Sequence, residues 1–284
     1  MRFIRENRNQ FKVKRMCSVL GVSQEGYYRW LKRKPSQRQM EDQKLLDRII
    51  QIHESSGKRY GSPKILDELR KQGFKCGHKR VERLMHENAI KSIIVKKRKP
   101  HSGSVKPEEA SENLLNRNFT VTERNKVWVT DITYIKAITQ WLYLCVFLDL
   151  HSRKIVGWSV SKNPDTRLVI SALSMACEKE QPNTGLLIHS DRGTQYGSKE
   201  YRKALDDNNF LQSMSRTGNC WDNACAESFF HIIKSEELNW VKVEGIGHLH
   251  KVVFRYIELF YNRIRTHSTL GYLSPIQFEN KKSA

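Results

Sequence analysis

The spacing of apolar residues changes from helical to strand-like near residue 110, and this change limits the folds that the chain can adopt. Before it, apolar residues recur every three to four positions in short segments that Gly and Pro separate. After it come three runs rich in β-branched and aromatic residues: 127–137, 141–150 and 154–160. Helices and strands then alternate: helices at 166–179 and 199–207, strands at 185–189 and 210–215.

Short polar turns join the first three strands, so they are expected to pair as an antiparallel meander. The whole order predicts an α/β fold with a mixed sheet flanked by helices. Ribonuclease-H-like topology fits this order, although the order alone is also compatible with other α/β folds. We expect five segments: an N-terminal helix-turn-helix-like segment (1–36), a second helical DNA-binding module (40–95), a basic linker (96–122), the mixed-sheet core (123–240) and a C-terminal helical extension (241–284).

The first segment has the pattern of two helices separated by a glycine turn. Val13, Met16 and Leu20 follow helical spacing, Gly21 interrupts it, and Ser23 is suited to begin a second helix as its N-cap. This is the pattern of a helix-turn-helix. A basic helical hairpin with a solvated face fits the same residues.

The second module is predicted to hold three helices. The first covers 45–53, and the second begins with Ser62 as N-cap and Pro63 as its first helical residue and ends at Gly73. The third runs over 79–87 with cations on its outer face.

Positive charge is concentrated at the N-terminal end. The 284 residues carry a net charge of +20, and residues 1–106 hold 28 of the 50 basic but only 10 of the 30 acidic residues. A split of this kind predicts an arm that binds a polyanion such as DNA. The candidate contacts are Arg29, Lys32, Arg33, Lys79, Arg80 and Arg83. Cations on short helices are, however, often only solvated.

Composition argues against other classes of protein. The longest strongly apolar run, 141–148, is too short to cross a bilayer, and the first residues have no signal-peptide pattern, so we expect a soluble cytoplasmic protein. The 6 cysteines form no CxxC pair, which predicts reduced thiols and neither a disulfide framework nor a structural zinc site.

Three acidic residues occupy positions that can meet at one end of the sheet. Asp131 lies in the first strand, Asp191 follows the fourth, and Glu227 lies early in the helix after the fifth. Carboxylates in such a cluster can hold Mg²⁺ ions for phosphoryl transfer. Spacing alone is weak support, because many acids lie in this half of the chain.

Three neighbours of these acids have structural interpretations. Asp149 fits a turn residue and Asp222 an N-cap. His189 shares a strand face with Asp191 and is expected to orient its carboxylate.

The residues around the three acids resemble the IS3 family of insertion-sequence transposases and, more distantly, retroviral integrases. Thirty-five residues separate Asp191 from Glu227, the spacing after which that DDE class is named. Similar stretches cover nearly the whole chain: 20–23, 27–28, 60–63, 127–134, 189–196, 221–224, 227–229, 261–262, Arg265, His267, Leu270 and Pro275.

The resemblance implies a ribonuclease-H-like core with Asp131, Asp191 and Glu227 as catalytic residues and ligands of two Mg²⁺ or Mn²⁺ ions. It implies cleavage and strand transfer of double-stranded DNA at terminal inverted repeats and a target, by an oligomer on DNA in a bacterial cytoplasm. It also implies an upstream-frame fusion partner and a contact of Lys234 with DNA near the cleaved phosphate. We assign Arg265 to the DNA backbone.

Two other functions fit the same residues. One is a DNA-binding regulator that is inactive without the upstream partner. The other is a ribonuclease-H-like nuclease that hydrolyses but does not join. Joined or circular DNA products would separate a transposase from both.

Overall fold

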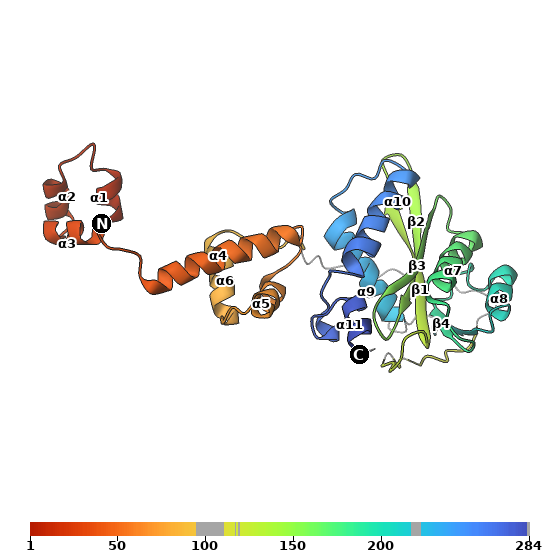
Figure 1. Cartoon of the computed structure of the whole chain (residues 1–284). Coiled ribbons are helices and arrows are strands. Elements are labelled where there is room, and N and C mark those ends of the chain that lie inside the picture. Colours follow the sequence, from red (N-terminus) through yellow and green to blue (C-terminus); the bar gives the residue numbers. More distant parts are fainter. Residues whose placement is uncertain (95–110, 117, 119, 217–222, 283–284) are drawn as a thin grey trace. The chain divides into compact units, whose positions relative to one another are not determined.

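The computed structural model describes residues 1–94, 111–116, 118, 120–216 and 223–282. The chain divides into two compact units, Met1–Lys91 and Ser92–Ala284. The first is entirely helical and the second is built on a sheet (Figure 1).

Three short helices open the first unit: α1 (Arg2–Glu6), α2 (Val13–Val19) and α3 (Gln24–Leu31). Ile4, Met16, Cys17 and Tyr27 form their small core. Gly21 has a positive φ of 64° between α2 and α3, and Ser23 caps α3 by accepting a hydrogen bond from the Gly26 amide. The helix, glycine turn and second helix predicted from sequence are therefore confirmed, but α1 was not expected.

The other helices of this unit are α4 (Gln37–Ser55), α5 (Ser62–Lys71) and α6 (His78–Glu87). Helix α4 begins earlier than predicted because Ser36 and Gln39 form a reciprocal capping box. Gly61, not Ser62, is the N-cap of α5. Buried side chains from all three helices form the interior: Leu45, Ile49, Ile52, Ile65, Leu66, Leu69, Val81, Leu84 and Met85.

The second unit contains a five-stranded sheet in the order β3-β2-β1-β4-β5. The strands are β1 (Val127–Lys136), β2 (Trp141–Asp149), β3 (Ile155–Ser161), β4 (Leu187–Ser190) and β5 (Leu211–Met214). The first three pair antiparallel, as predicted, whereas β4 pairs parallel with both β1 and β5. This is the mixed sheet of a ribonuclease-H-like core.

Helices cover both faces of the sheet (Figure 1). On one face lie α7 (Thr166–Glu180) and α8 (Lys199–Asp206). Gly157 of β3 permits the close approach of α7, since an added Cβ would lie 2.3 Å from the Ala172 carbonyl oxygen.

The other face is covered by α9 (Ala224–Ile233), α10 (Ile246–Phe254) and the π-helical turn η3 (Arg255–Tyr261). A second π-helical turn, η2 (Lys234–Leu238), follows α9, and η4 (Ser268–Leu270) and α11 (Pro275–Lys282) end the chain. Residues 241–284 were expected to form a helical extension, and their apolar side chains share one hydrophobic core with α9 and the strands.

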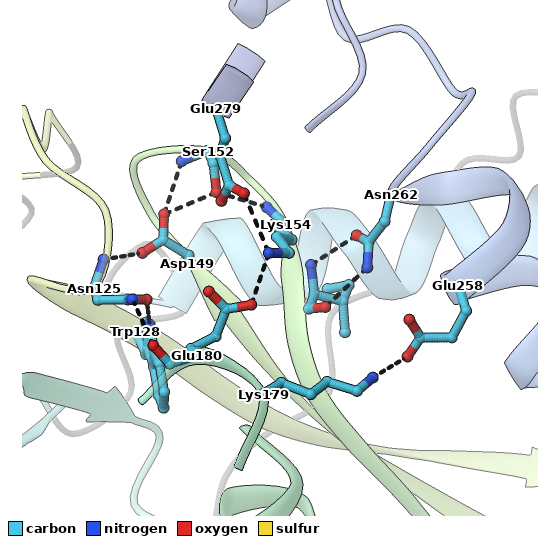
Figure 2. Close-up of polar contacts among 11 residues, drawn as sticks. Asn125, Trp128, Asp149, Ser152, Lys154, Lys179, Glu180, Glu258, Asn262 and Glu279 are labelled. Carbon is cyan, nitrogen blue, oxygen red and sulfur yellow. Dashed lines mark hydrogen bonds and ion pairs between the residues drawn. The ribbon is translucent and has the colours of Figure 1, made fainter. Parts of the chain in front are cut away.

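Polar contacts attach this C-terminal segment to the sheet (Figure 2). The Lys154 ammonium pairs with Glu180 of α7 at 2.7 Å and with Glu279 of α11 at 3.1 Å. The Asn262 side chain both accepts from the amide of Ile155 and donates to its carbonyl oxygen. The segment is thus held to β3 at several points.

Residues 111–115 lie against the edge strand β5. The Met214 amide donates to the Glu112 carbonyl oxygen, and the Ser213 hydroxyl accepts from the amides of Leu114 and Leu115. The Leu115 side chain is buried in the core. Residues 111–115, which lie within the segment predicted to be a linker, therefore cover the β5 edge of the sheet.

Candidate active site

Asp131 and Asp191 lie side by side along two paired strands. Val129 of β1 pairs in parallel register with His189 of β4, and each acid is two residues further along its strand direction. Strand β4 ends at Ser190, so beyond this point β1 continues without its parallel neighbour. The register therefore places the two acids close together where β4 ends.

A buried asparagine positions the third acid. Asn223 is the N-cap of α9, and its side-chain amide donates to the carbonyl oxygen of Thr130, which precedes Asp131, at 3.2 Å. Glu227 lies one helical turn further along α9. The start of α9 is therefore attached to β1 beside Asp131, which directs Glu227 toward the same end of the sheet.

The carboxyl groups interact electrostatically. The pKa of Asp131 is raised well above its ordinary value, first because the group is buried and then because Asp191 and Glu227 bring negative charge close to it. The Ile132 amide, which donates to Asp131 at 2.8 Å, and the Lys234 ammonium oppose this rise. Burial also raises the pKa of Asp191, and a hydrogen bond from the Gly193 amide opposes it.

Lys234 has a defined position next to these acids. Its ammonium donates to the Thr133 hydroxyl at 2.6 Å and lies 4.7 Å from the centre of the Tyr134 ring. The residue begins the π-helical turn η2, a type of turn often found at functional sites. His231, which shares the helical face of Glu227 by its spacing, is exposed.

The ring of His189, which was expected to orient the Asp191 carboxylate, contacts two serine hydroxyls. It is fully buried, and its ring nitrogens contact the hydroxyls of Ser213 and Ser215 at 2.8 and 3.2 Å. The Ser215 hydroxyl in turn donates to the Ser190 carbonyl oxygen. The histidine therefore holds β4 to β5 and supports the end of the strand that precedes Asp191.

The rival acid Asp149 is a turn residue, as predicted. Its buried carboxylate accepts hydrogen bonds from the amide and the hydroxyl of Ser152 and from the amide of Asn125 (Figure 2). Asp222, predicted to be an N-cap, lies outside the described residues.

The cations predicted to contact DNA have different surroundings. Arg29, Lys32, Arg33 and Lys79 are exposed, and Arg29 pairs with Glu25 at the surface of α3. Arg80 and Arg83 both pair with Asp42 of α4, at 2.6 and 2.7 Å, and a hydrogen bond from Arg83 lowers the pKa of that acid. These two arginines therefore join α6 to α4.

Arg265, assigned above to the DNA backbone, lies in the interior. Its guanidinium binds both carboxylate oxygens of the buried Glu236 in η2, with a shortest contact of 2.7 Å. The Tyr256 hydroxyl donates to the same carboxylate at 2.7 Å. This buried pair fixes η2 to the C-terminal segment.

Three residues with a positioning role were not identified from sequence. Asn223 attaches α9 to β1, Thr133 holds Lys234, and Glu236 pairs with Arg265. Asn223 lies inside a stretch that matches the family, so its motif was a usable signal. Thr133 also lies inside a matching stretch, 127–134, whereas Glu236 had no comparable signal.

Two features are absent from the described residues: a preformed metal-ligand group and a helix that could span a membrane. No group of three or more His, Cys, Asp or Glu side chains in this part of the chain is arranged to hold a metal ion as it stands. Nor does any helix described here have the length and apolar character that crossing a membrane requires.

Comparisons with known proteins give a consistent result. Family models of an integrase core domain match residues 121–220 and 227–282, and a model of an HTH-like domain matches residues 40–98. The chain is 39% identical over 284 residues to "Transposase InsF for insertion sequence IS3A" of Escherichia coli (strain K12), covering 99% of each chain. It is 37% identical over 266 residues to "Insertion element IS600 uncharacterized 31 kDa protein" of Shigella sonnei, covering 94% of this chain and 98% of that one.

A weaker similarity extends to solved structures. The "HTLV-2 integrase catalytic core domain in complex with magnesium (dimeric form)" is 20% identical, with a TM-score of 0.41 over 54% of this chain and 94% of that chain. The identity to the E. coli transposase over almost the full length of both chains decides the family. This chain belongs to the IS3 family of insertion-sequence transposases, enzymes of DNA transposition with a DDE integrase core.

Proposed function

We propose that Asp131, Asp191 and Glu227 are the catalytic carboxylates of this transposase and that they bind Mg²⁺ or Mn²⁺ together with the DNA. The observation that carries the proposal is the half-buried Asp131 carboxyl, whose pKa is raised first by desolvation and then by the negative charges of Asp191 and Glu227. Such repulsion is relieved when a cation enters the cluster. The oxygen-only donor set suits a hard divalent ion.

The three acids fit a metal site in which the DNA substrate supplies some of the ligands. A Mg²⁺ ion takes one or two carboxylates and completes its shell with water and phosphate oxygens. Asp131, Asp191 and Glu227 would hold two such ions when DNA supplies the remaining oxygens.

When bound, the two ions would activate the attacking oxygen and stabilise the leaving oxygen of an in-line phosphoryl transfer. A water oxygen attacks phosphorus at the element end, the bond from phosphorus to the 3′ oxygen breaks, and that oxygen takes a proton. The 3′-hydroxyl oxygen then attacks the phosphorus of a second phosphodiester, the bond from that phosphorus to its own 3′ oxygen breaks, and the released oxygen takes the proton that the attacking hydroxyl loses, so that the strands are joined. Lys234, held by Thr133, would bind a phosphate beside the cleaved bond.

DNA is the partner of a transposase, and we propose a division of labour along this chain. The helical segments 1–36 and 40–95 would bind the terminal inverted repeats, and the core would bind the cleavage site and the target. Assembly as an oligomer on DNA in the bacterial cytoplasm, with an upstream-frame fusion partner, completes the proposal. Light scattering of protein with and without end-sequence DNA would test the oligomer.

Strand transfer with end-sequence DNA and Mg²⁺ tests the catalytic assignment. We expect Asp131→Asn, Asp191→Asn and Glu227→Gln each to bind the DNA and to lose cleavage and joining. The surface variant Glu200→Gln in α8 is the control. Joining that persists in any of the three variants would refute the role of that residue.

The same assay separates the other functions. The wild-type chain and each variant are tested alone and as a fusion with the upstream-frame protein of the element. Cleavage without joined products in both forms would identify a nuclease. Binding without reaction by the chain alone, with reaction restored by the fusion, would identify a regulator that is inactive without its upstream partner.

A further inference from the structure

Two aromatic side chains next to the proposed active site are exposed together. Tyr134 in β1 and Trp141 in β2 leave 62% and 50% of their surface accessible, although aromatic residues are usually buried. Their rings meet edge to face with centres 5.4 Å apart. We call this pair the aromatic platform.

The register of the hairpin places both rings on one face. Tyr134 pairs with Tyr143 and Lys136 pairs with Trp141, so the two platform residues are diagonal neighbours across β1 and β2. A diagonal edge-to-face contact covers only part of each ring. The remaining ring surface is open to a flat partner.

The platform is close to the chemistry of the core. Tyr134 follows Asp131 by three positions on the same strand, about 10 Å along it, and its side chain leaves the opposite face of the sheet. Lys234 connects the two sites, since its ammonium is bound to Thr133 and lies over the ring of Tyr134. A cation and exposed aromatic rings at one place match the two parts of a nucleotide, its phosphate and its base.

We propose that Tyr134 and Trp141 stack an unpaired nucleobase of the element end while Lys234 holds the adjacent phosphate. This proposal rests on the proposed function, because it needs the DNA end to lie at Asp131. A terminal base that leaves its duplex finds a stacking partner in these rings, which Lys234 links to the proposed catalytic end of the sheet.

The test uses the full chain and end-sequence duplexes that carry 2-aminopurine at successive positions around the cleaved bond, in EDTA so that no reaction occurs. Stacking quenches the emission of this base. We expect one position to be quenched by the wild-type protein and to recover its emission with the double variant Tyr134→Ala, Trp141→Ala. We also expect the double variant to bind DNA with unpaired terminal nucleotides about 10-fold more weakly, and fully paired DNA as the wild type does.

Two controls separate stacking from folding. Tyr134→Phe with Trp141→Phe keeps two rings and should restore quenching, whereas Phe254→Ala removes an equally exposed aromatic side chain of α10 and should change nothing. Equal quenching by the wild type and the double alanine variant, or no quenched position with the wild type, overturns the proposal. So does a loss of quenching that the phenylalanine variant fails to restore.

Because this assay contains no metal and no reaction, its failure is distinct from failure of the catalytic assignment. If the catalytic assignment fails, joining persists in the Asp131→Asn variant while the quenching can remain. If the platform fails, joining still depends on Asp131 while the quenching is absent or insensitive to the rings.

Discussion

The side-chain amide of Asn223 and the carbonyl oxygen of Thr130 are joined by a hydrogen bond of 3.2 Å that attaches helix α9 to strand β1. Asp131 is the next residue on one side of this bond, and Glu227 lies one turn away on the other. Two acids that are far apart in the sequence thus depend on one contact for their relative position.

Removing this contact should lower activity more than DNA binding. We expect Asn223→Ala to reduce strand transfer about 10- to 100-fold, because small displacements of reacting groups have effects of this size. Affinity for end-sequence DNA should stay near that of the wild type. Asn208→Ala, which removes a similar side-chain bond at the surface of α8, is the matched control, and equal losses in both variants would contradict the prediction.

The repulsion at Asp131 predicts a gain in stability when its charge is removed. A carboxyl whose folded pKa is raised stays protonated in the folded state over a range where the unfolded chain has lost its proton, so stability falls as pH rises through that range. At neutral pH in EDTA, Asp131→Asn should therefore melt at a higher temperature than the wild type. Its melting temperature should also rise less when Mg²⁺ and end-sequence DNA are added.

Thermal unfolding monitored by circular dichroism from pH 4 to pH 8 would measure this difference. The exposed Asp207→Asn is the control, since that acid pairs only at the surface with Lys203. The prediction is wrong if Asp131→Asn and the wild type have the same pH profile in EDTA.

Substitution of the adjacent cations Lys79 and Arg80 in α6 should change different properties, DNA binding in one case and stability in the other. Lys79 is exposed and Arg80 pairs with Asp42. If Lys79 contacts DNA phosphate, Lys79→Gln lowers the slope of log affinity against log salt by about 1. Arg80→Gln should instead lower the melting temperature and leave that slope nearly unchanged. Fluorescence anisotropy over a series of salt concentrations gives both slopes, and the reverse order would count against the assignment.

Arg265 should affect stability and not the salt dependence of DNA binding. Arg265→Ala leaves Glu236 buried without its guanidinium, a change that costs about 3–5 kcal/mol and lowers the melting temperature by roughly 10 °C. Exposed Arg263→Ala is the control and should have little effect on stability. A normal melting temperature for Arg265→Ala together with a smaller salt slope would restore the DNA contact expected from sequence.

The strands could be predicted because their signals are local, whereas the role of the three acids stays a prediction. Alternation of residues identified β1, the apolar run identified β2, and the matching stretches around Asp131, Asp191 and Glu227 identified the acids. The early start of α4 also had a local signal, since Ser36 and Gln39 have capping-box spacing.

The burial of side chains, and their pairing with residues distant in the sequence, could not be predicted from local patterns. Arg265 is a cation near other cations in the sequence, and its partner Glu236 lies 29 residues earlier. His189 shares the strand face expected for contact with Asp191, yet its ring faces β5, whose place beside β4 follows only from the assembled sheet. In both cases the sequence indicated the chemistry of the side chain but not which residues would surround it.

Because residues 111–115 cover β5, the residue at which an expressed catalytic fragment starts should affect its solubility. An uncovered edge strand is a template for intermolecular pairing and aggregation. A catalytic fragment that starts at residue 111 keeps this protection, whereas one that starts at residue 123 exposes the edge. The shorter fragment should precipitate at concentrations at which the longer one stays monodisperse.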